Sequence, residues 1–432
     1  MKYAIVGTGA RHHMFREAIN ETYNTTSELV GICDNNANRL ALSADQIEHQ
    51  QGNGIATYEA SEFDTMLREQ KPDKVVVTVP DYMHHEYIVR ALRSGHDVMT
   101  EKPMTTDLPK LKAILDAQAE TGKSVTVTFN YRYTPARTQL KEILQSGAIG
   151  DITAVDFRWH LDRVHGADYF RRWHRYKEKS GGLLVHKSTH HFDLLNWWIG
   201  STPKTVSAND KLDFYTPATA ARLGLSDHGA RCHTCEIAHK CDFELNLQND
   251  PLLRELYLDA EAADGYLRDR CVWDDDITIE DTMQVQVSYQ NDVSLNYTLC
   301  AYSPWEGLEL KFHGTKGELT HRHVEVHGVF GGERDLTNRD TMETTLHVAG
   351  SAPENIDVWH GVGDHGGADP VMLGYLFDAE KVGPDPYARG SSHIDGAWSI
   401  LTGIAANEAM AQNKRIHIES LLSANGIRLQ RF

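Results

Sequence analysis

The 432-residue sequence contains no apolar run long enough to span a lipid bilayer, which takes about 20 residues. It also contains no internal repeat and no low-complexity tract. The amino terminus leads directly into an apolar segment at Tyr3, without the basic and apolar regions of a signal peptide. We therefore expect a cytoplasmic protein.

Basic residues are too few to balance the acidic ones. The chain has 43 Lys and Arg against 61 Asp and Glu, which gives a net charge of −18. This balance argues against nucleic acid or an anionic membrane as a partner, although it allows a local basic pocket. Charged residues make up 24% and hydrophobic residues 41%, as in a soluble globular enzyme. At this length we expect two domains.

Cysteine is scarce and unevenly placed, since four of the six cysteines share one region. In a reducing cytosol disulfides are disfavoured, so metal binding is the natural interpretation. Four thiolates would hold a structural zinc and fix a long insertion near residues 225–275. An iron–sulfur cluster also needs four thiolates, and free or disulfide-bonded thiols remain an alternative. The predicted metal ligands, spaced Cys-x2-Cys-x5-Cys-x29-Cys, are Cys232, Cys235, Cys241 and Cys271.

The first expected strand, residues 3–6, is followed by Gly7-Thr8-Gly9, then Arg11, His12 and an expected helix. A strand, a glycine turn and a helix N-terminus form a cradle for an anion such as a dinucleotide phosphate. The full fingerprint has a third glycine where this chain has His12, so a simple tight turn remains an alternative.

A second expected strand, residues 29–33, ends at Asp34 and Asn35. An acidic residue at this point can accept both ribose hydroxyls of the adenosine and would repel a 2′-phosphate. The sequence therefore favours NAD over NADP, although Arg39 is near enough to complicate this preference.

Three more expected strands, near 75–79, 97–100 and 125–129, exit into polar segments. Ligands of doubly wound sheets lie beyond the carboxyl ends of the strands. In Glu101-Lys102-Pro103 the proline favours extended geometry at Lys102 and directs its side chain out of the strand, so Lys102 is a catalytic candidate, with a surface turn as the alternative. The polar residues of the other exits are Thr78, Pro80, His84, Asn130, Tyr131 and Arg132.

From about residue 151 the pattern changes to alternation of apolar and polar residues, as in 154–160 and 283–289. Such strands have one solvated face and are typical of antiparallel sheets. We therefore expect an α/β protein with a Rossmann domain, a doubly wound parallel sheet, in residues 1–128. Residues 129–432 should form an α+β domain on an open, mostly antiparallel sheet. The polar side of this sheet is free to meet another subunit, so we expect a homodimer or homotetramer.

Gly181-Gly182 precedes a segment that is expected to be one helix through residue 199. On such a helix His186, His190 and Asp193 share one face, and the apolar face packs inside. This arrangement resembles an active-site wall, and a buried helix with hydrogen-bonded histidines is the alternative.

Two other polar segments are candidates for binding a saccharide. The first carries His165, Arg172 and Trp173, whose ring can stack on a sugar and whose arginine favours an acidic sugar such as a uronate. The second begins at His365 and contains two glycines, so it could close over a substrate. A solvated loop and a plain connector are the respective alternatives.

Taken together, these blocks resemble the Gfo/Idh/MocA oxidoreductases over essentially the whole chain. The resemblance rests on Glu101-Lys102-Pro103 combined with Gly181-Gly182, His190 and Asp193. It implies NAD or NADP in the Rossmann domain and oxidation or reduction of a secondary alcohol or ketone of a sugar, inositol or glycoside. Some members use the same chemistry transiently to cleave glycosidic bonds. The run from His186 to Asp193 resembles more closely a bacterial subgroup associated with rhamnogalacturonan use.

The resemblance implies that Lys102 contacts both cofactor and substrate and that His190 is the acid/base or its partner. An imidazole, with a reference pKa of about 6.5, can accept a proton near neutrality. The expected substrate-binding residues are Tyr131, Arg132, His165, Arg172, Trp173, His186, Lys187, Asp193 and His365. The expected cofactor-binding residues are Gly7, Thr8, Gly9, Arg11, His12, Asp34, Asn35, Thr78, Pro80, His84, Glu101, Lys102 and Asn130.

The sequence thus predicts an NAD-dependent sugar or glycoside oxidoreductase. One alternative is a redox-neutral glycosidase that oxidises its sugar transiently and releases no net NADH. The other is a non-catalytic sugar or nucleotide sensor, for which Lys102 and His190 would be dispensable.

Overall fold

The computed structural model describes residues 1–325, 341–362 and 364–431, without the side chains of residues 364 and 365. Within this part the chain forms two compact units. The first contains residues 1–133, 247–268 and 368–397, and the second contains the rest. The first break lies close to the domain boundary expected at residue 128, whereas the two later segments of the first unit were not expected. None of the described helices is long and apolar enough to cross a membrane.

The first unit is built on a six-stranded parallel sheet in the order β3-β2-β1-β4-β5-β6. The order reverses between β1 and β4, and in such sheets ligands bind at this switch point. The sheet confirms the expected Rossmann fold. Its strands are β1 (Lys2–Val6), β2 (Glu28–Asp34), β3 (Thr57–Glu59), β4 (Lys74–Val77), β5 (Asp97–Thr100) and β6 (Val125–Val127).

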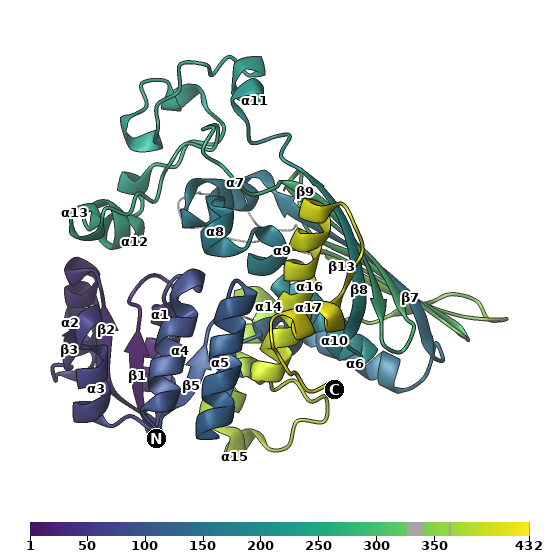
Figure 1. Cartoon of the computed structure of the whole chain (residues 1–432), viewed down its shortest axis with the longest axis horizontal. Helices are drawn as coiled ribbons and strands as arrows, with labels where there is room; N and C mark the ends of the chain where they lie inside the picture. The colour runs from purple at the N-terminus through teal and green to yellow at the C-terminus, as the bar shows by residue number, and fades with distance from the viewer. Residues whose placement is uncertain (326–340, 363, 432) are drawn as a thin grey trace. The chain divides into compact units, whose positions relative to one another are not determined.

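Helices alternate with the strands of this sheet along the chain, and α1 to α5 are labelled beside it in Figure 1. The core between them is apolar and contains Tyr3, Ile5 and Phe15, all at most 1% exposed. The α5 helix begins after Asp107, which caps its N-terminus, and ends at Gly122, whose φ is 66°. The helices are α1 (His12–Glu17), α2 (Ala37–Gln51), α3 (Phe63–Gln70), α4 (His84–Arg93) and α5 (Leu108–Thr121).

Two segments from later in the chain complete the first unit. Residues 247–268 form short helical turns, α12 (Pro251–Leu253), η9 (Arg254–Leu258) and α13 (Glu261–Asp264). The other segment includes most of α14 (Asp364–Phe377), which packs Ala368 and Met372 against Tyr133, and α15 (Ala379–Val382). His365 belongs to α14, but its side chain lies outside the described part.

The second unit contains a nine-stranded sheet in the order β14-β13-β12-β11-β7-β10-β9-β8-β15. All neighbours are antiparallel except β7 and β10, which confirms the expected open sheet. On β9, Val285 and Val287 are buried and Gln284 and Gln286 are exposed, as the alternation predicted. The strands are β7 (Ile152–Asp162), β8 (Pro203–Lys211), β9 (Thr282–Tyr289), β10 (Ser294–Ser303), β11 (Glu306–Gly314), β12 (Gly317–Glu325), β13 (Thr341–Val348), β14 (Glu354–Ile356) and β15 (Ile416–His417).

The helix expected after Gly182 is interrupted, so the prediction of one continuous helix was wrong. It forms α9 (Leu183–His186) and α10 (Thr189–Ile199). The Ser188 N–H bonds to the carbonyl of Leu183, five residues back, and the Ser188 hydroxyl bonds to Tyr297 at 2.8 Å. Because of this wider turn, His186 and His190 lie on two separate helices, and the regular α-helical relation expected between them is lost. All residues of α10 are buried.

The other helices with residues in the second unit are labelled in Figure 1. They are α6 (Pro135–Gln145), α7 (Arg163–Arg171), α8 (Lys177–Ser180), α11 (Pro217–Arg222), α16 (His393–Gln412) and α17 (Ile418–Ala424).

Candidate active site

The glycine turn after β1 packs closely against the backbone at the exit of β4. Gly7 has φ of +96°, and a Cβ there would lie 2.6 Å from the backbone nitrogen of Val79. Only glycine fits this position. At Gly9 a Cβ would meet only the hydroxyl of Tyr257, at 4.0 Å. The turn therefore has the form of the predicted phosphate cradle.

His12 stands where a dinucleotide fingerprint has its third glycine, and it is 1% exposed. Its Nδ1 lies 2.6 Å from the carbonyl oxygen of Gly9, and its Nε2 lies 2.8 Å from the hydroxyl of Ser43. Burial lowers the pKa of His12 to about 3, so the ring is neutral. His12 therefore stabilises the turn through both ring nitrogens, and its predicted contact with the cofactor stays a prediction.

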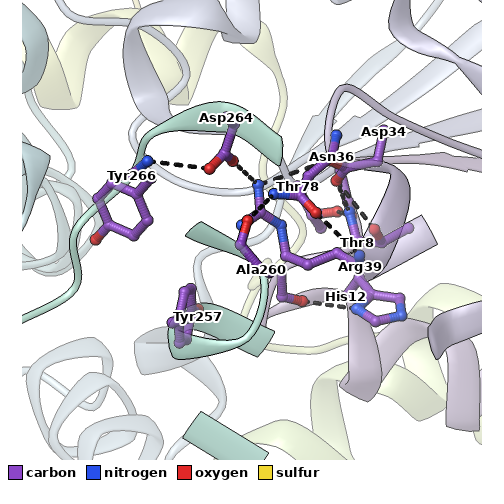
Figure 2. Close-up of polar contacts among 12 residues, drawn as sticks. Thr8, His12, Asp34, Asn36, Arg39, Thr78, Tyr257, Ala260, Asp264 and Tyr266 are labelled. Atoms are coloured by element: carbon purple, nitrogen blue, oxygen red, sulfur yellow. Dashed lines mark hydrogen bonds and ion pairs between the residues drawn. The ribbon is translucent and has the colours of Figure 1, made fainter. Parts of the chain in front are cut away.

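Asp34 ends β2 and is 7% exposed (Figure 2). Its Oδ2 accepts hydrogen bonds from the Thr8 N–H at 2.5 Å and the Thr8 hydroxyl at 3.0 Å, and its Oδ1 accepts one from the Asn36 N–H at 2.7 Å. The guanidinium of Arg39 lies 3.8 Å away. Asp34 is therefore fixed beside the glycine turn, and Asn35 next to it is exposed. The predicted contact of Asp34 with a ribose stays a prediction.

The exits of β4 and β5 are tied to the glycine turn and to each other. The Thr78 hydroxyl donates to the carbonyl of Gly7 at 2.7 Å. The ring of His84 lies between the carbonyls of Val79 and Pro103, both at 2.8 Å, and burial lowers its pKa. Thr78 and His84, both predicted cofactor-binding residues, therefore hold the exits of β4 and β5 in place.

Lys102 lies at the exit of β5 within a charged network. Its N–H bonds to the carboxylate of Glu101 at 3.2 Å. Glu101 also pairs with Arg11 at 2.7 Å, and Arg11 lies 3.7 Å from Asp369 of α14. Asp369 in turn accepts a hydrogen bond from the side chain of Asn130 at 2.7 Å. Asp369 was not among the predicted site residues. The glycines Gly366 and Gly367 before it had indicated only that this segment could close over a substrate.

Three other residues of the first unit were predicted to bind substrate or cofactor. Arg132 is 2% exposed and pairs with Asp395 at 2.9 Å, and its predicted contact with substrate stays a prediction. Tyr131 is also buried. Pro80 begins the short turn that leads into α4.

The second unit brings several predicted substrate residues together. The Nδ1 of His165 lies 2.9 Å from the carboxylate of Glu306, and its Nε2 lies 2.9 Å from the hydroxyl of Tyr169. The Tyr169 ring also contacts His186, at 5.3 Å between centroids. Glu306, at the start of β11, is 2% exposed and was not predicted, because strand-end residues carry no local signal of their own.

His186 lies in an aromatic surrounding that includes His174 at 4.1 Å and Trp173 at 5.9 Å between ring centroids. Arg172 pairs with Asp168 at 3.2 Å. The predicted residues on both sides of the double glycine therefore form one polar and aromatic cluster in this unit.

Lys187, between α9 and α10, is a buried amine that lies 4.8 Å over the ring of Trp159. Burial lowers its pKa, while Glu306 and Glu325 act in the opposite direction. His190 and Asp193 on α10 are 6% and 1% exposed. Water is thus largely excluded from the predicted acid/base residues, which strengthens their electrostatic interactions.

Two family models together match most of the chain. The model described as the NAD-binding Rossmann fold of an oxidoreductase family matches residues 1–129, and its C-terminal alpha/beta domain matches residues 141–418. The chain belongs to the Gfo/Idh/MocA oxidoreductase family. It is therefore an oxidoreductase with an NAD-binding Rossmann domain, as the sequence predicted.

Relatives of this Gfo/Idh/MocA oxidoreductase include named sugar dehydrogenases. A Bacillus subtilis protein that carries the name oxidoreductase YteT is 34% identical over 96% of both chains. The D-glucoside 3-dehydrogenase of Escherichia coli is 27% identical over 52% of this chain and 61% of its own length. A levoglucosan dehydrogenase solved in complex with NADH shares the fold, with a TM-score of 0.66 at 16% identity over 97% of this chain and 99% of that one.

Four of the six cysteines of this Gfo/Idh/MocA oxidoreductase, Cys232, Cys235, Cys241 and Cys271, line one cavity in the second unit, which His228 and Trp273 also line. Among the described residues, the three metal-ligand atoms that lie within 4.8 Å of one another belong to His228, Cys271 and Asp274. The cysteines are all described, and no three of their sulfurs form such a group. The structural zinc expected at the four clustered cysteines therefore stays a prediction.

Proposed function

We propose that this oxidoreductase transfers a hydride between NAD and a secondary hydroxyl or ketone of a sugar or glycoside. The observation that carries the proposal is the placement of Lys102 at the carboxyl end of β5, in the same unit as the glycine turn and Asp34. In doubly wound sheets this edge receives the dinucleotide. The sugar dehydrogenases among the relatives support the substrate class.

The nicotinamide supplies the hydride acceptor or donor, and the chain supplies position, charge and a proton acceptor. Glu101 and Arg11 hold the Lys102 segment, so the ammonium can hydrogen-bond the reacting oxygen and stabilise negative charge on it. We assign the base that takes the hydroxyl proton to His190.

The preference for NAD over NADP is supported by Asp34. Its carboxylate is fixed by Thr8 and Asn36, so it stays beside the ribose end of the expected cofactor site. A 2′-phosphate would meet this negative charge. Equal or tighter binding of NADP would contradict this part of the proposal.

The cluster of His165, Trp173, Arg172 and His186 supports a saccharide substrate. Trp173 offers a ring face for the apolar side of a sugar, and the histidines offer hydrogen bonds to hydroxyls. Arg172 favours an acidic sugar such as a uronate, although Asp168 balances its charge in part.

A substrate panel tests the proposal. Uronates, rhamnosides, inositols and plant oligosaccharides are incubated with NAD, and both NADH absorbance and released sugar are measured. The proposal predicts net NADH with at least one sugar or glycoside. Release of sugar without net NADH would instead identify a redox-neutral glycosidase.

We further propose that a second copy of the chain covers the polar face of the nine-stranded sheet. Exposed amides of β8, β9 and β10 line a shallow cavity of about 450 Å³ there, and these include Asn209, Gln284, Gln286 and Asn296. Such a face can form many hydrogen bonds with a symmetric partner.

A further inference from the structure

Residues 247–268 fold against the glycine turn and the end of β2, more than 200 positions earlier in the chain (Figure 2). The carbonyl of Ala260 accepts a hydrogen bond from the buried side chain of Asn36 at 3.0 Å. The hydroxyl of Tyr257 accepts one from the N–H of Ala10, in the turn itself, at 3.4 Å. This segment therefore belongs to the expected cofactor site, although it lies within the cysteine-rich insertion of the sequence.

Within this contact, Asp264 forms an ion pair with Arg39 (Figure 2). Each side chain is 10% exposed. Burial raises the pKa of Asp264, but hydrogen bonds from the Asn36 side chain, the Tyr266 N–H and Arg39 outweigh it, so the pKa lies below its ordinary value. Asp264 is therefore charged at neutral pH and holds the guanidinium.

The pair changes what Arg39 can do at the ribose end. An arginine beside the acidic residue of β2 is the group that would accommodate a 2′-phosphate. Here its charge faces two carboxylates, Asp264 and, at 3.8 Å, Asp34. One cation against two anions leaves the ribose end negative, which disfavours a further phosphate.

We propose that Asp264 determines cofactor specificity by engaging Arg39 and thereby excluding the 2′-phosphate of NADP. This inference rests on the proposed function, in which the glycine turn binds a nicotinamide dinucleotide. It assigns a role to a residue that lies 230 positions from Asp34 in the sequence.

The test compares Asp264→Asn with Asp259→Asn by titration of NAD and NADP. Asp259 lies in the same segment but is 57% exposed and contacts Asn38 only through its backbone carbonyl, so its variant is a matched charge control. Asp264→Asn should tighten NADP binding about tenfold or more, the factor for one charge-assisted hydrogen bond. Asp259→Asn should leave both affinities unchanged.

A second variant isolates Arg39. Adding Arg39→Gln to Asp264→Asn should abolish the gain in NADP affinity. If the gain came instead from a general loosening of residues 247–268, it would persist in the double variant. The inference is overturned if Asp264→Asn leaves NADP binding unchanged or if Asp259→Asn gives an equal gain. Wild-type protein that binds neither dinucleotide would contradict the proposed function instead.

The cysteine cavity supports a second, independent inference. Cys232 and Cys235 lie on and beside one helical turn, and Cys271 is joined to it by the backbone bonds of Cys232 to Asp269 and of Cys271 to Ala230, both 2.9 Å. The remaining wall is mostly apolar and includes Leu225, Ile237, Ala238 and Trp273. Four thiols that line one apolar cavity form a built site for a thiophilic metal centre.

Nitrogen groups lie close to three of the four sulfurs. The Gly229 N–H points to Cys235 Sγ at 3.3 Å, and the Arg171 guanidinium lies 3.7 Å from Cys232 Sγ. His228 Nδ1 lies 3.3 Å from Cys271 Sγ. Hydrogen bonds to ligand sulfurs stabilise the negative thiolates of metal centres.

Four thiolates can hold a tetrahedral zinc ion or an iron–sulfur cluster. We propose that Cys232, Cys235, Cys241 and Cys271 bind one such thiolate-ligated metal centre.

Purification without oxygen and without added metal tests this inference. Metal analysis should find either about one zinc ion per chain, or iron with acid-labile sulfide and a visible absorption that bleaches on reduction. Cys235→Ser should lose the metal, whereas Cys33→Ser and Cys300→Ser, outside the cavity, should keep it. A wild-type chain without bound metal, or a Cys235→Ser chain that keeps the metal, would overturn the inference.

Discussion

At the scale of single residues, the account depends on Lys102 and His190. Lys102→Ala and His190→Ala should each reduce kcat at least about a hundredfold, because each removes charge stabilisation or proton transfer in the transition state. NAD binding and the folded state should persist in both, since Asp34 and the glycine turn are untouched. Steady-state kinetics and NAD titration check this. A variant with nearly normal kcat would remove that residue from the mechanism.

His12 gives a prediction about acid stability. Its folded pKa of about 3 lies below the unfolded value of about 6.5, so only the unfolded state binds this proton between those pH values. The stability that the neutral ring provides is complete above pH 6.5 and is lost as the pH falls toward 3. Between pH 7 and 5 this amounts to about 2 kcal/mol.

His12→Gln keeps a hydrogen-bonding side chain without the titration. Denaturant unfolding at pH 7 and pH 5 should therefore show a smaller loss of stability in this variant than in the wild type. Equal losses in both proteins would mean that His12 is not the acid-sensitive group.

At the scale of elements, local patterns predicted strands and helices well where the signal was local. The α5 helix has its cap and its glycine within its own sequence, and β9 has its alternation. The break between α9 and α10 was missed because it depends on Tyr297, which is over a hundred residues away. For the same reason the roles of Asp264 and Asp369 in the first unit could not be predicted, since both contacts join distant segments.

The segment from 225 to 275 gives a prediction about metal removal. It contains short turns and few regular elements, so the cysteine centre should contribute much of its order. After metal loss, hydrogen exchange should rise in this segment before the strands β1 to β6 become exposed. Simultaneous loss of protection in both regions would show that the centre does not act locally.

At the scale of the whole molecule, the two units divide the predicted residues. The cofactor residues lie in the first unit, and the saccharide cluster with His165, His186 and His190 lies in the second. The family models divide the sequence once, near residue 130, whereas the first unit also contains residues 247–268 and 368–397. The sequence could indicate the first break, because apolar strands precede it and alternating strands follow it. The two later segments join the first unit through contacts between distant residues, which have no local signal.

The polar sheet face predicts the oligomeric state. Light scattering at micromolar concentration should give the mass of a dimer or tetramer. Replacing Gln284 and Gln286, both exposed on β9, with glutamate should shift the protein toward the monomer, because like charges would meet across a two-fold axis. A wild-type monomer at that concentration would mean that solvent covers this face.

The central claim is hydride transfer between a sugar carbinol and NAD. A sugar from the panel that is turned over is prepared with deuterium at its carbinol carbons, and the nicotinamide is analysed by mass spectrometry after a single turnover. The account predicts one deuterium in the reduced cofactor, and no label in the Lys102→Ala protein. Turnover of the sugar by protein that holds no nicotinamide, or turnover with an unlabelled cofactor, would contradict it.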